Sequence, residues 1–285
     1  MKPAPFSYHR TRTVPETVAL LAELGDGAKI LAGGQSLVPM MNFRLARPSA
    51  LVDITRIPGL DYMTAGPDGL RIGALTRHRA IELCQDPAVL DGFGVLPRSA
   101  RWIGHYPIRA RGTLGGSIAH ADPAAEWCLL AVLLNARIQL TSPHGQRTVP
   151  VTEFFEGFYS TTAEPDEMIT EIHFPVPARR ATLTEFAQRQ GDFAVVAAAV
   201  SIDLGGDGGG CRSLRVVLGG VGPLPHIVDT SDLAGQPATA ATWRAAGKLA
   251  AAQIDPPADG HGTAGYRKRL AATLTERALA EAAAR

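Results

Sequence analysis

Two short glycine-rich segments hold the residues of this sequence best suited to binding chemistry. The first glycine segment, Leu31–Leu37, reads LAGGQSL, and the second, Gly112–Glu126, reads GTLGGSIAHADPAAE. Glycine reaches positive φ and lets the backbone approach a ligand closely. Successive backbone N–H groups in such a turn form a concavity for an anion, and a helix that begins there adds its positive end. The two segments together predict one extended anionic ligand held from two sides.

Each segment offers specific donors and acceptors. The N–H groups from Gly33 to Leu37 and the hydroxyl of Ser36 could hold a diphosphate. Either pair by itself could instead be an ordinary strand-to-helix turn. Neither a G-x-G-x-x-G nor a G-x-x-x-x-G-K-[ST] pattern occurs, so a Rossmann dinucleotide fingerprint and a Walker loop are excluded. The remaining polar candidates lie in the second segment and are Thr113, Gly116, Ser117, Asp122 and Glu126.

The elements that must position these residues alternate between strands and helices in the first half of the chain. Thr13 and Glu16 have the spacing of a capping box, Pro15 lies in the first turn, and Gly25 ends the helical pattern. Further strands are expected at 28–32, 50–54, 70–74 and 136–141. Helices are expected from Leu37, from Thr76 to about Cys84, around Trp102 and Ile103, and from Pro123 to Leu134 with Asp122 as N-cap.

The second half of the chain begins near a proline-rich boundary at 175–180, which predicts two units, 1–177 and 178–285. Strand patterns are expected at 193–204 and 214–218, with a hairpin turn or loop at 205–210 between them. From about Ala240 onward, alanine-rich helical patterns dominate.

Composition excludes several function classes. The chain has 285 residues with 28 basic and 27 acidic side chains, so its net charge of +1 implies no nucleic acid as a partner. Cys84, Cys128 and Cys211 stand far apart, so their thiolates cannot by themselves hold an iron–sulfur cluster or a zinc ion. An unpaired thiol and the absence of a signal-peptide pattern predict a cytoplasmic protein. The longest apolar runs fall short of the ~20 residues that a membrane span needs.

The glycine segments also carry a family resemblance. Ala32–Leu37, with residues 48–54 after it and Thr113–Glu126 later, resembles the FAD-binding medium subunit of the molybdenum hydroxylases, the xanthine dehydrogenase and aerobic carbon monoxide dehydrogenase family. The resemblance implies an α+β fold over 1–177, the two-subdomain FAD-binding fold of the vanillyl-alcohol oxidase type. A smaller α+β flavoprotein C-terminal domain is implied over 178–285.

The resemblance also implies roles for individual residues. Ile103, Met168 and Ile169 match positions that line the flavin or adenine, with plain core packing as the alternative. Phe193 matches an aromatic position near the isoalloxazine where relatives often have tyrosine, and the family's lysine a few residues earlier has no clear equivalent in 183–186. The resemblance places the diphosphate at Ala32, Gly33, Gly34, Gln35, Ser36 and Leu37, its other side at Thr113, Gly116 and Ser117, and the ribose or adenosine end at Asp122 and Glu126.

The implied function is electron transfer through non-covalent FAD. The chain would take electrons from an iron–sulfur small subunit, pass them to an external acceptor, and work beside a molybdenum large subunit in a dimer of heterotrimers. No catalytic side chain or metal site is implied in this chain, because the flavin performs the redox chemistry. Two alternatives stay open: a stand-alone FAD oxidoreductase, and a non-redox module that binds a nucleotide or phosphate.

Three charged residues near the second segment have competing interpretations. His120 could relay a proton near the flavin, or it could only pack or cap. Arg109 and Arg111 could neutralise phosphate, face a partner, or simply be solvated.

Overall fold

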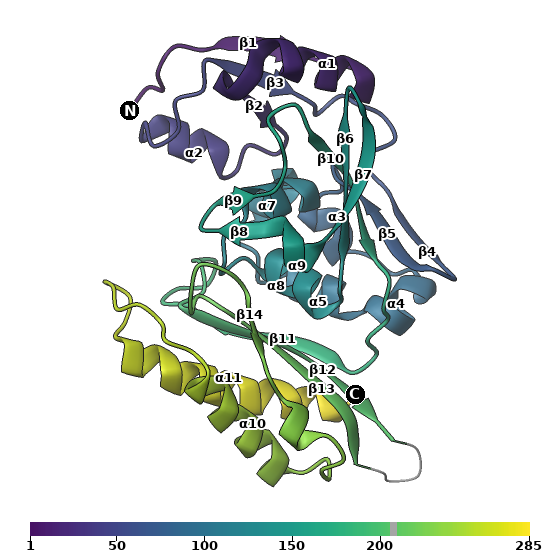
Figure 1. The fold of residues 1–285 in the computed structure, drawn as a ribbon, viewed down its shortest axis with the longest axis vertical. Coiled ribbons are helices and arrows are strands. Elements are labelled where there is room, and N and C mark those ends of the chain that lie inside the picture. Colours follow the sequence, from purple (N-terminus) through teal and green to yellow (C-terminus); the bar gives the residue numbers. More distant parts are fainter. Residues whose placement is uncertain (206–209) are drawn as a thin grey trace.

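The computed structural model describes residues 1–205 and 210–285 and stacks three groups of elements along its longest axis (Figure 1). A small sheet lies at the N-terminal end, a five-stranded sheet with most of the helices lies in the middle, and a four-stranded sheet backed by two long helices forms the other end. Helices and strands are mixed throughout, which confirms the α+β class. Most of the expected loop at 205–210 lies outside the described residues.

The N-terminal group is a parallel three-stranded sheet in the order β1-β3-β2, with α1 packed on it. Thr13 caps α1 as expected, because its hydroxyl accepts from the Glu16 N–H at 3.2 Å. Val18 and Leu21 of α1 are buried in the same hydrophobic cluster as Val52. The elements are β1 (Ser7–Arg10), α1 (Val14–Leu24), the 3-10 helix η1 (Gly25–Gly27), β2 (Ala28–Leu31), α2 (Leu37–Asn42) and β3 (Ala50–Asp53).

The central group is an antiparallel five-stranded sheet in the order β4-β5-β10-β6-β7, packed against a set of short helices. Helix α8 is apolar on every side, and its residues from Trp127 to Leu133 are all buried. The five strands are β4 (Met63–Gly66), β5 (Gly69–Gly73), β6 (Arg137–Ser142), β7 (Gly145–Pro150) and β10 (Met168–Phe174), while β8 (Phe155–Gly157) and β9 (Ser160–Thr161) form a separate two-stranded sheet. The helices are α3 (His78–Glu82), α4 (Pro87–Phe93), α5 (Val95–Ala100), α6 (Tyr106–Arg111), α7 (Leu114–His120), α8 (Glu126–Leu133) and α9 (Val151–Phe154).

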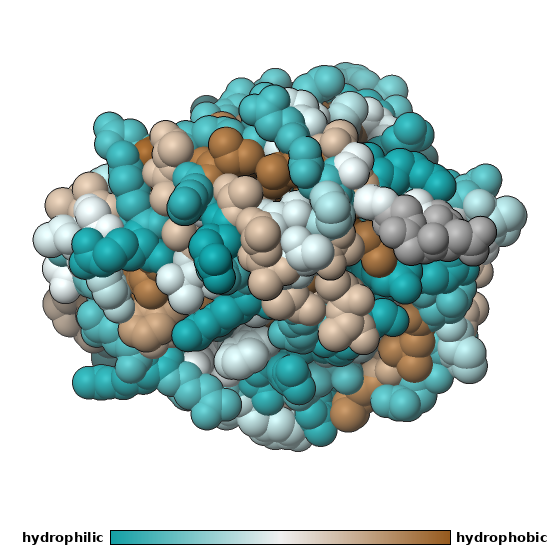
Figure 2. All heavy atoms as spheres, turned by 90° about the horizontal axis from the view of Figure 1, so that it is seen from below, coloured by the Kyte–Doolittle hydropathy of each residue, from teal (hydrophilic) through white to brown (hydrophobic). Residues whose placement is uncertain are grey.

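The C-terminal group is an antiparallel four-stranded sheet in the order β11-β12-β13-β14, covered on one face by α10 and α11. Alternate residues of β12 explain its place between two layers: Ala197 and Ala199 join the central core, whereas Ala198 and Val200 pack with the two helices. Figure 2 looks onto this end and shows hydrophilic side chains with small hydrophobic patches between them. The elements are β11 (Ala181–Phe186), β12 (Val196–Leu204), β13 (Cys211–Gly219), β14 (His226–Val228), the 3-10 helix η2 (Ser231–Leu233), α10 (Ala240–Ala252) and α11 (Ala264–Ala283).

Several expected boundaries are wrong. Asp122 does not cap α8, which begins at Glu126; its carboxylate accepts instead from the Ala124 N–H at 2.8 Å in a turn before the helix. Thr76 does not cap α3, because its hydroxyl bonds to the backbone of Tyr62 on a neighbouring segment. The helix expected around Trp102 ends at Ala100. Asp122 is used in a local turn, whereas Thr76 is used by a segment 14 residues away.

Across the described ranges, no helix combines the length and apolar character needed to cross a membrane. The same residues contain no group of three or more His, Cys, Asp or Glu side chains placed to hold a metal ion.

Candidate cofactor site

The first glycine segment is an open loop between β2 and α2. Gly34 has φ +70°, a backbone conformation that favours glycine. In the described part of the chain, no protein acceptor receives the four consecutive N–H groups from Gly33 to Ser36. Backbone N–H groups inside a protein are normally paired, so a run of four free donors in one loop is suited to an anion.

Two side chains of this loop have different tasks. The Gln35 amide turns back and donates to the Gly33 carbonyl oxygen at 2.9 Å, so it braces the loop and leaves only its backbone N–H for a ligand. Ser36 is the N-cap of α2, yet its hydroxyl makes no capping hydrogen bond. The Ser36 hydroxyl therefore remains available as a further donor beside the four amides.

The second glycine segment is built differently from the expected turn. Gly115 and Gly116 lie inside the first turn of α7, and the N-cap Thr113 accepts from the Gly116 N–H at 3.1 Å. The Gly115 N–H donates to the Ala74 carbonyl oxygen at 2.9 Å, and a Cβ at Gly115 would lie 2.7 Å from the Ala74 Cβ. Gly115 is therefore needed for close packing, whereas Gly116 and Ser117 lie on the accessible side of the turn.

The two segments are in direct contact. A Cβ at Gly33 would lie 2.7 Å from the Gly112 Cα, and closer still to the Arg111 carbonyl oxygen. This contact places the free amides of the first segment beside Thr113 and the exposed start of α7. The expectation that both segments face one ligand is therefore geometrically possible.

Two residues that sequence reasoning missed hold the second segment from behind. Arg77 donates to the Arg111 carbonyl oxygen at 2.7 Å, and the His78 N–H donates to the Gly112 carbonyl oxygen at 3.1 Å. The His78 ring accepts from the Trp127 indole N–H at 2.9 Å, and burial, with the Arg109 charge, lowers the pKa of His78 to about 4. His78 is therefore a neutral structural residue at pH 7.

The end of the second segment forms a small polar cluster. The Tyr159 hydroxyl, from the β8–β9 turn, lies 3.5 Å from an Asp122 carboxylate oxygen, and its ring packs on His120 with centroids 4.9 Å apart. Burial lowers the pKa of His120, which favours the neutral form of the ring that packs on Tyr159. Tyr159 carried no local signal in the sequence, because the contact depends on how β8 and β9 fold back.

Glu126 in α8 and Glu185 in β11 are a pair of carboxyl groups that interact electrostatically, one from the central group and one from the C-terminal group. Burial, against an opposing backbone hydrogen bond and with a smaller contribution from the Asp122 charge, raises the pKa of Glu126 to about 7. Burial and the charge of Glu126 raise the pKa of Glu185 to about 8. One Glu185 oxygen is buried without a hydrogen-bond partner in the described chain. Glu126 is thus part of a carboxyl pair that the sequence did not reveal.

The remaining expected contacts of the flavin lie in two places. Gly191 packs so closely on the His105 ring that a Cβ there would overlap it, which brings the loop carrying Phe193 next to the turn carrying Ile103. Phe193 is 65% exposed and Ile103 is 8% exposed, so the aromatic ring is the more accessible of the two. Met168 and Ile169 are buried in β10, Met168 with the N-terminal cluster and Ile169 with the central one.

The two arginines before Thr113 have separate roles. Arg109 pairs with Glu82 at 2.9 Å and donates to the carbonyl oxygens of Ile103 and Gly104, so it braces the turn after α5. Arg111 is exposed, and its side chain has no ion pair within the described residues. Of the two, Arg109 has its guanidinium group fixed by contacts within the described chain, and Arg111 does not.

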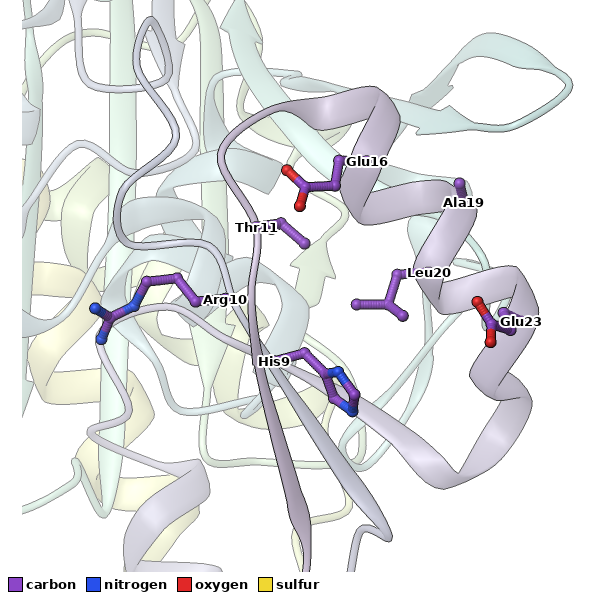
Figure 3. A pocket seen from close by; sticks show the side chains of 7 residues that line it. All are labelled: His9, Arg10, Thr11, Glu16, Ala19, Leu20 and Glu23. Atoms are coloured by element: carbon purple, nitrogen blue, oxygen red, sulfur yellow. The ribbon is translucent and has the colours of Figure 1, made fainter.

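A cavity of about 450 Å³ lies elsewhere, between the end of β1 and α1 (Figure 3). His9, Glu16 and Glu23 border it without converging on one point, and Arg10 points away. It reaches neither glycine segment, and its polar groups do not form a catalytic arrangement.

Two family models match the chain. The model described as the FAD binding domain in molybdopterin dehydrogenase matches residues 4–177, and the one described as the CO dehydrogenase flavoprotein C-terminal domain matches residues 181–282.

Curated relatives and solved structures match over the whole length. The 6-hydroxypseudooxynicotine dehydrogenase complex subunit alpha of Paenarthrobacter nicotinovorans is 39% identical over 99% of this chain and 96% of its own length. The carbon monoxide dehydrogenase medium chain of Hydrogenophaga pseudoflava is 36% identical over 100% and 99%. A chain of quinoline 2-oxidoreductase from Pseudomonas putida 86 superposes with a TM-score of 0.94 at 35% identity, over 100% of this chain and 99% of that one.

Proposed function

Because this chain belongs to the FAD-binding medium subunits of the molybdenum hydroxylases, we propose that it is the electron-transfer subunit of such a complex. It carries FAD and passes electrons from a partner's iron–sulfur centre to an external acceptor. The observation that carries this proposal is the run of four N–H groups from Gly33 to Ser36 that have no acceptor among the described residues, in a loop that contacts the second glycine segment.

The protein's contribution is to bind and orient the cofactor, since FAD supplies the redox chemistry when bound. The free amides of the first segment and the Ser36 hydroxyl hold the diphosphate. Thr113, Gly116 and Ser117 hold its other side, with Asp122 and Glu126 toward the ribose or adenosine end. Ala32, Leu37, Ile103, Met168, Ile169 and Phe193 complete the cofactor-binding set.

No side chain of this chain is assigned a catalytic proton transfer. Arg77 and His78 position the second segment, and Arg109 braces the turn that carries Ile103. The FAD-binding part extends to residue 177, and the flavoprotein C-terminal part begins at 178, in the connection between β10 and β11.

The complex that we propose contains an iron–sulfur small subunit and a molybdenum large subunit, assembled as a dimer of heterotrimers. Symmetric duplication is the usual form of such assemblies. The three cysteines are buried and unpaired, in keeping with a reducing cytoplasm. A native mass measured from the source cell that contains only the single 30.1 kDa chain would contradict this assembly.

An absorption spectrum of the purified chain tests the function directly. Flavin bands, and quantitative release of the flavin into the supernatant after acid precipitation, are the expected result for non-covalent FAD. A colourless chain that does not take up FAD would instead support a non-redox phosphate-binding module. A yellow chain that oxidises a substrate without partner subunits would support a stand-alone oxidoreductase.

A further inference from the structure

A second cavity lies in the crevice between the central and C-terminal groups and takes no part in the proposed FAD site. Its volume is about 210 Å³, and it is bordered by α5 and the turn after it, by β11, and by α11. Four arginines line it: Arg98, Arg101, Arg277 and Arg285. Four positively charged guanidinium groups around one small cavity repel one another unless negatively charged groups lie between them.

The negative charge supplied by the protein is incomplete. Arg285 pairs with Glu281 at 2.5 Å, and the same Glu281 oxygen accepts from the Thr182 hydroxyl at 3.0 Å. In the described chain, Arg98, Arg101 and Arg277 have no carboxylate within ion-pair distance. Glu185 also lines the cavity, but burial and Glu126 raise its pKa to about 8, so it is mostly uncharged at pH 7. Three guanidinium groups therefore remain uncompensated.

Arg98 is the most constrained of the three. One of its terminal nitrogens donates to the Ala181 carbonyl oxygen at 2.9 Å, while its Nε is buried with no partner among the described residues. The pKa of Arg98 is lowered most by burial and next by the charge of Arg285; the charge of Glu281 opposes this, and the charge of Arg101 adds a smaller lowering. A buried donor without an acceptor costs free energy that a ligand oxygen could recover.

The edge of β11 adds a backbone donor. β11 is the outer strand of its sheet, and the Arg180 and Phe186 carbonyl oxygens point inward, where they accept from the N–H groups of Ile202 in β12 and Val195 just before it. Ala181 points outward, since its carbonyl oxygen accepts from Arg98. Residues of a strand alternate, so the N–H of Leu183 also points outward, on the side of the cavity.

We propose that this cavity is a binding site for a small oxyanion of the phosphate or carboxylate class. Guanidinium groups bind both kinds of oxyanion through paired, charge-assisted hydrogen bonds. The cavity is smaller than the roughly 300–1,000 Å³ typical of sites for drug-sized ligands, so an inorganic anion or a short dicarboxylate fits better than a nucleotide. Because the walls come from both the central and the C-terminal groups, the bound anion would join them.

The test is isothermal titration calorimetry of the full chain saturated with FAD, so that added anions cannot enter the diphosphate site. Inorganic phosphate and succinate are titrated separately, with sodium chloride at matched ionic strength. We expect saturable binding of one anion per chain by at least one of the two. Phosphate binding identifies a phosphate ligand, and succinate binding identifies a carboxylate.

The variant Arg101→Gln/Arg277→Gln should weaken that binding at least tenfold. Both side chains are exposed and make no hydrogen bond to another described residue, so the fold should persist. The control Arg56→Gln/Arg137→Gln removes the same charge from exposed positions outside the cavity and should bind like wild type. Equal affinity of wild type and the cavity variant overturns the proposal. Absence of saturable binding also overturns the proposal. A cavity variant that binds small anions like wild type but no longer assembles with partner subunits would overturn it as well.

Discussion

The first and second glycine segments share a Gly-Gly pair followed by serine, yet the chain uses the two pairs in different ways. In the first, Gly34 supplies a positive φ, and four N–H groups of the loop around it have no acceptor in the described parts of the chain. In the second, the pair lies in a helical turn whose N–H groups are already bonded, to Thr113 and to Ala74. The same residue types therefore supply hydrogen-bond donors in the first segment and close packing in the second.

Because the two glycine segments differ in this way, they would hold a shared ligand with different kinds of contact. The first segment can give up to four backbone hydrogen bonds, while the second can give hydroxyl groups and an unobstructed surface at Gly116. Gly33 joins the two, because its missing side chain lets the backbones touch. Substitutions at these glycines should consequently differ in size and in kind.

Gly33→Ala should have the largest effect. Its Cβ would meet backbone atoms of Arg111 and Gly112, which cannot rotate away. Overpacking costs about 1–3 kcal/mol, and each lost charge-assisted hydrogen bond costs about 1.5–3 kcal/mol. We expect FAD affinity to fall about a hundredfold, near 2.8 kcal/mol, and the melting temperature to fall as well. Flavin fluorescence and circular dichroism measure both, and wild-type values for both would show that the segments do not meet.

Gly34→Ala should come next. An alanine at positive φ costs about 1–2 kcal/mol, and a shifted loop loses part of its grip, so FAD affinity should fall about tenfold or more. Gly59→Ala is the matched control, because Gly59 also has positive φ, at +78°, with nothing within 4 Å of its Cβ. The control should lose similar stability but keep its FAD affinity. Equal FAD affinity in the two variants would mean that the first segment is an ordinary turn that does not bind FAD.

Gly116→Ala should weaken FAD binding by several-fold while changing stability little, because the helix preference of alanine opposes the crowding of the Thr113 cap. The position is helical and exposed, and its Cβ would meet just the Thr113 hydroxyl, at 2.9 Å. Alanine favours helix over glycine by up to about 1 kcal/mol. Gly265→Ala provides the control, since Gly265 is exposed in the first turn of the Thr263-capped α11. Unchanged affinity in Gly116→Ala would leave the second segment with a structural role alone.

The double variant Gly34→Ala/Gly116→Ala sharpens the same comparison. If both positions contact one cofactor, the loss in binding free energy should be smaller than the sum of the single losses, because neighbouring sites couple. Strictly additive losses in fluorescence titrations would indicate independent effects and argue against a shared ligand.

The smallest effect concerns the carboxyl pair at the end of the second segment. The folded-state pKa values of about 7 for Glu126 and about 8 for Glu185 lie above the ordinary value, near 4.3. The unfolded chain therefore ionises first, and stability falls as pH rises from about 4 to about 8. Glu185→Gln should remove much of this loss of stability. At pH 8 we expect the variant to be more stable by on the order of 1 kcal/mol, which raises the melting temperature by roughly 2–4 °C.

Thermal unfolding at pH 5 and pH 8 measures this effect. The gain from Glu185→Gln should be present at pH 8 and small at pH 5. The exposed Glu153→Gln serves as control and should show no such difference. An equal gain at both pH values would mean that the two carboxyl groups do not share a site.

Local patterns predicted much of the secondary structure. The cap of α1 by Thr13 and the strand before the first glycine segment follow from residues within a few positions of one another. Such elements depend on short-range hydrogen bonds and φ preferences, which the sequence states directly. The start of α8 was misplaced because Asp122 satisfies an N–H in a turn as well as at a helix end.

What the sequence by itself determined is the family and the residues from which the proposed site is drawn. The tertiary structure alone decided that Gly33 touches Gly112, that Arg77 and His78 hold that contact, and that Tyr159 and Glu185 approach the second segment. These approaches join segments that lie far apart in the chain. They arise from how separate sheets and helices bury their apolar faces against one another, and no local spacing encodes that arrangement.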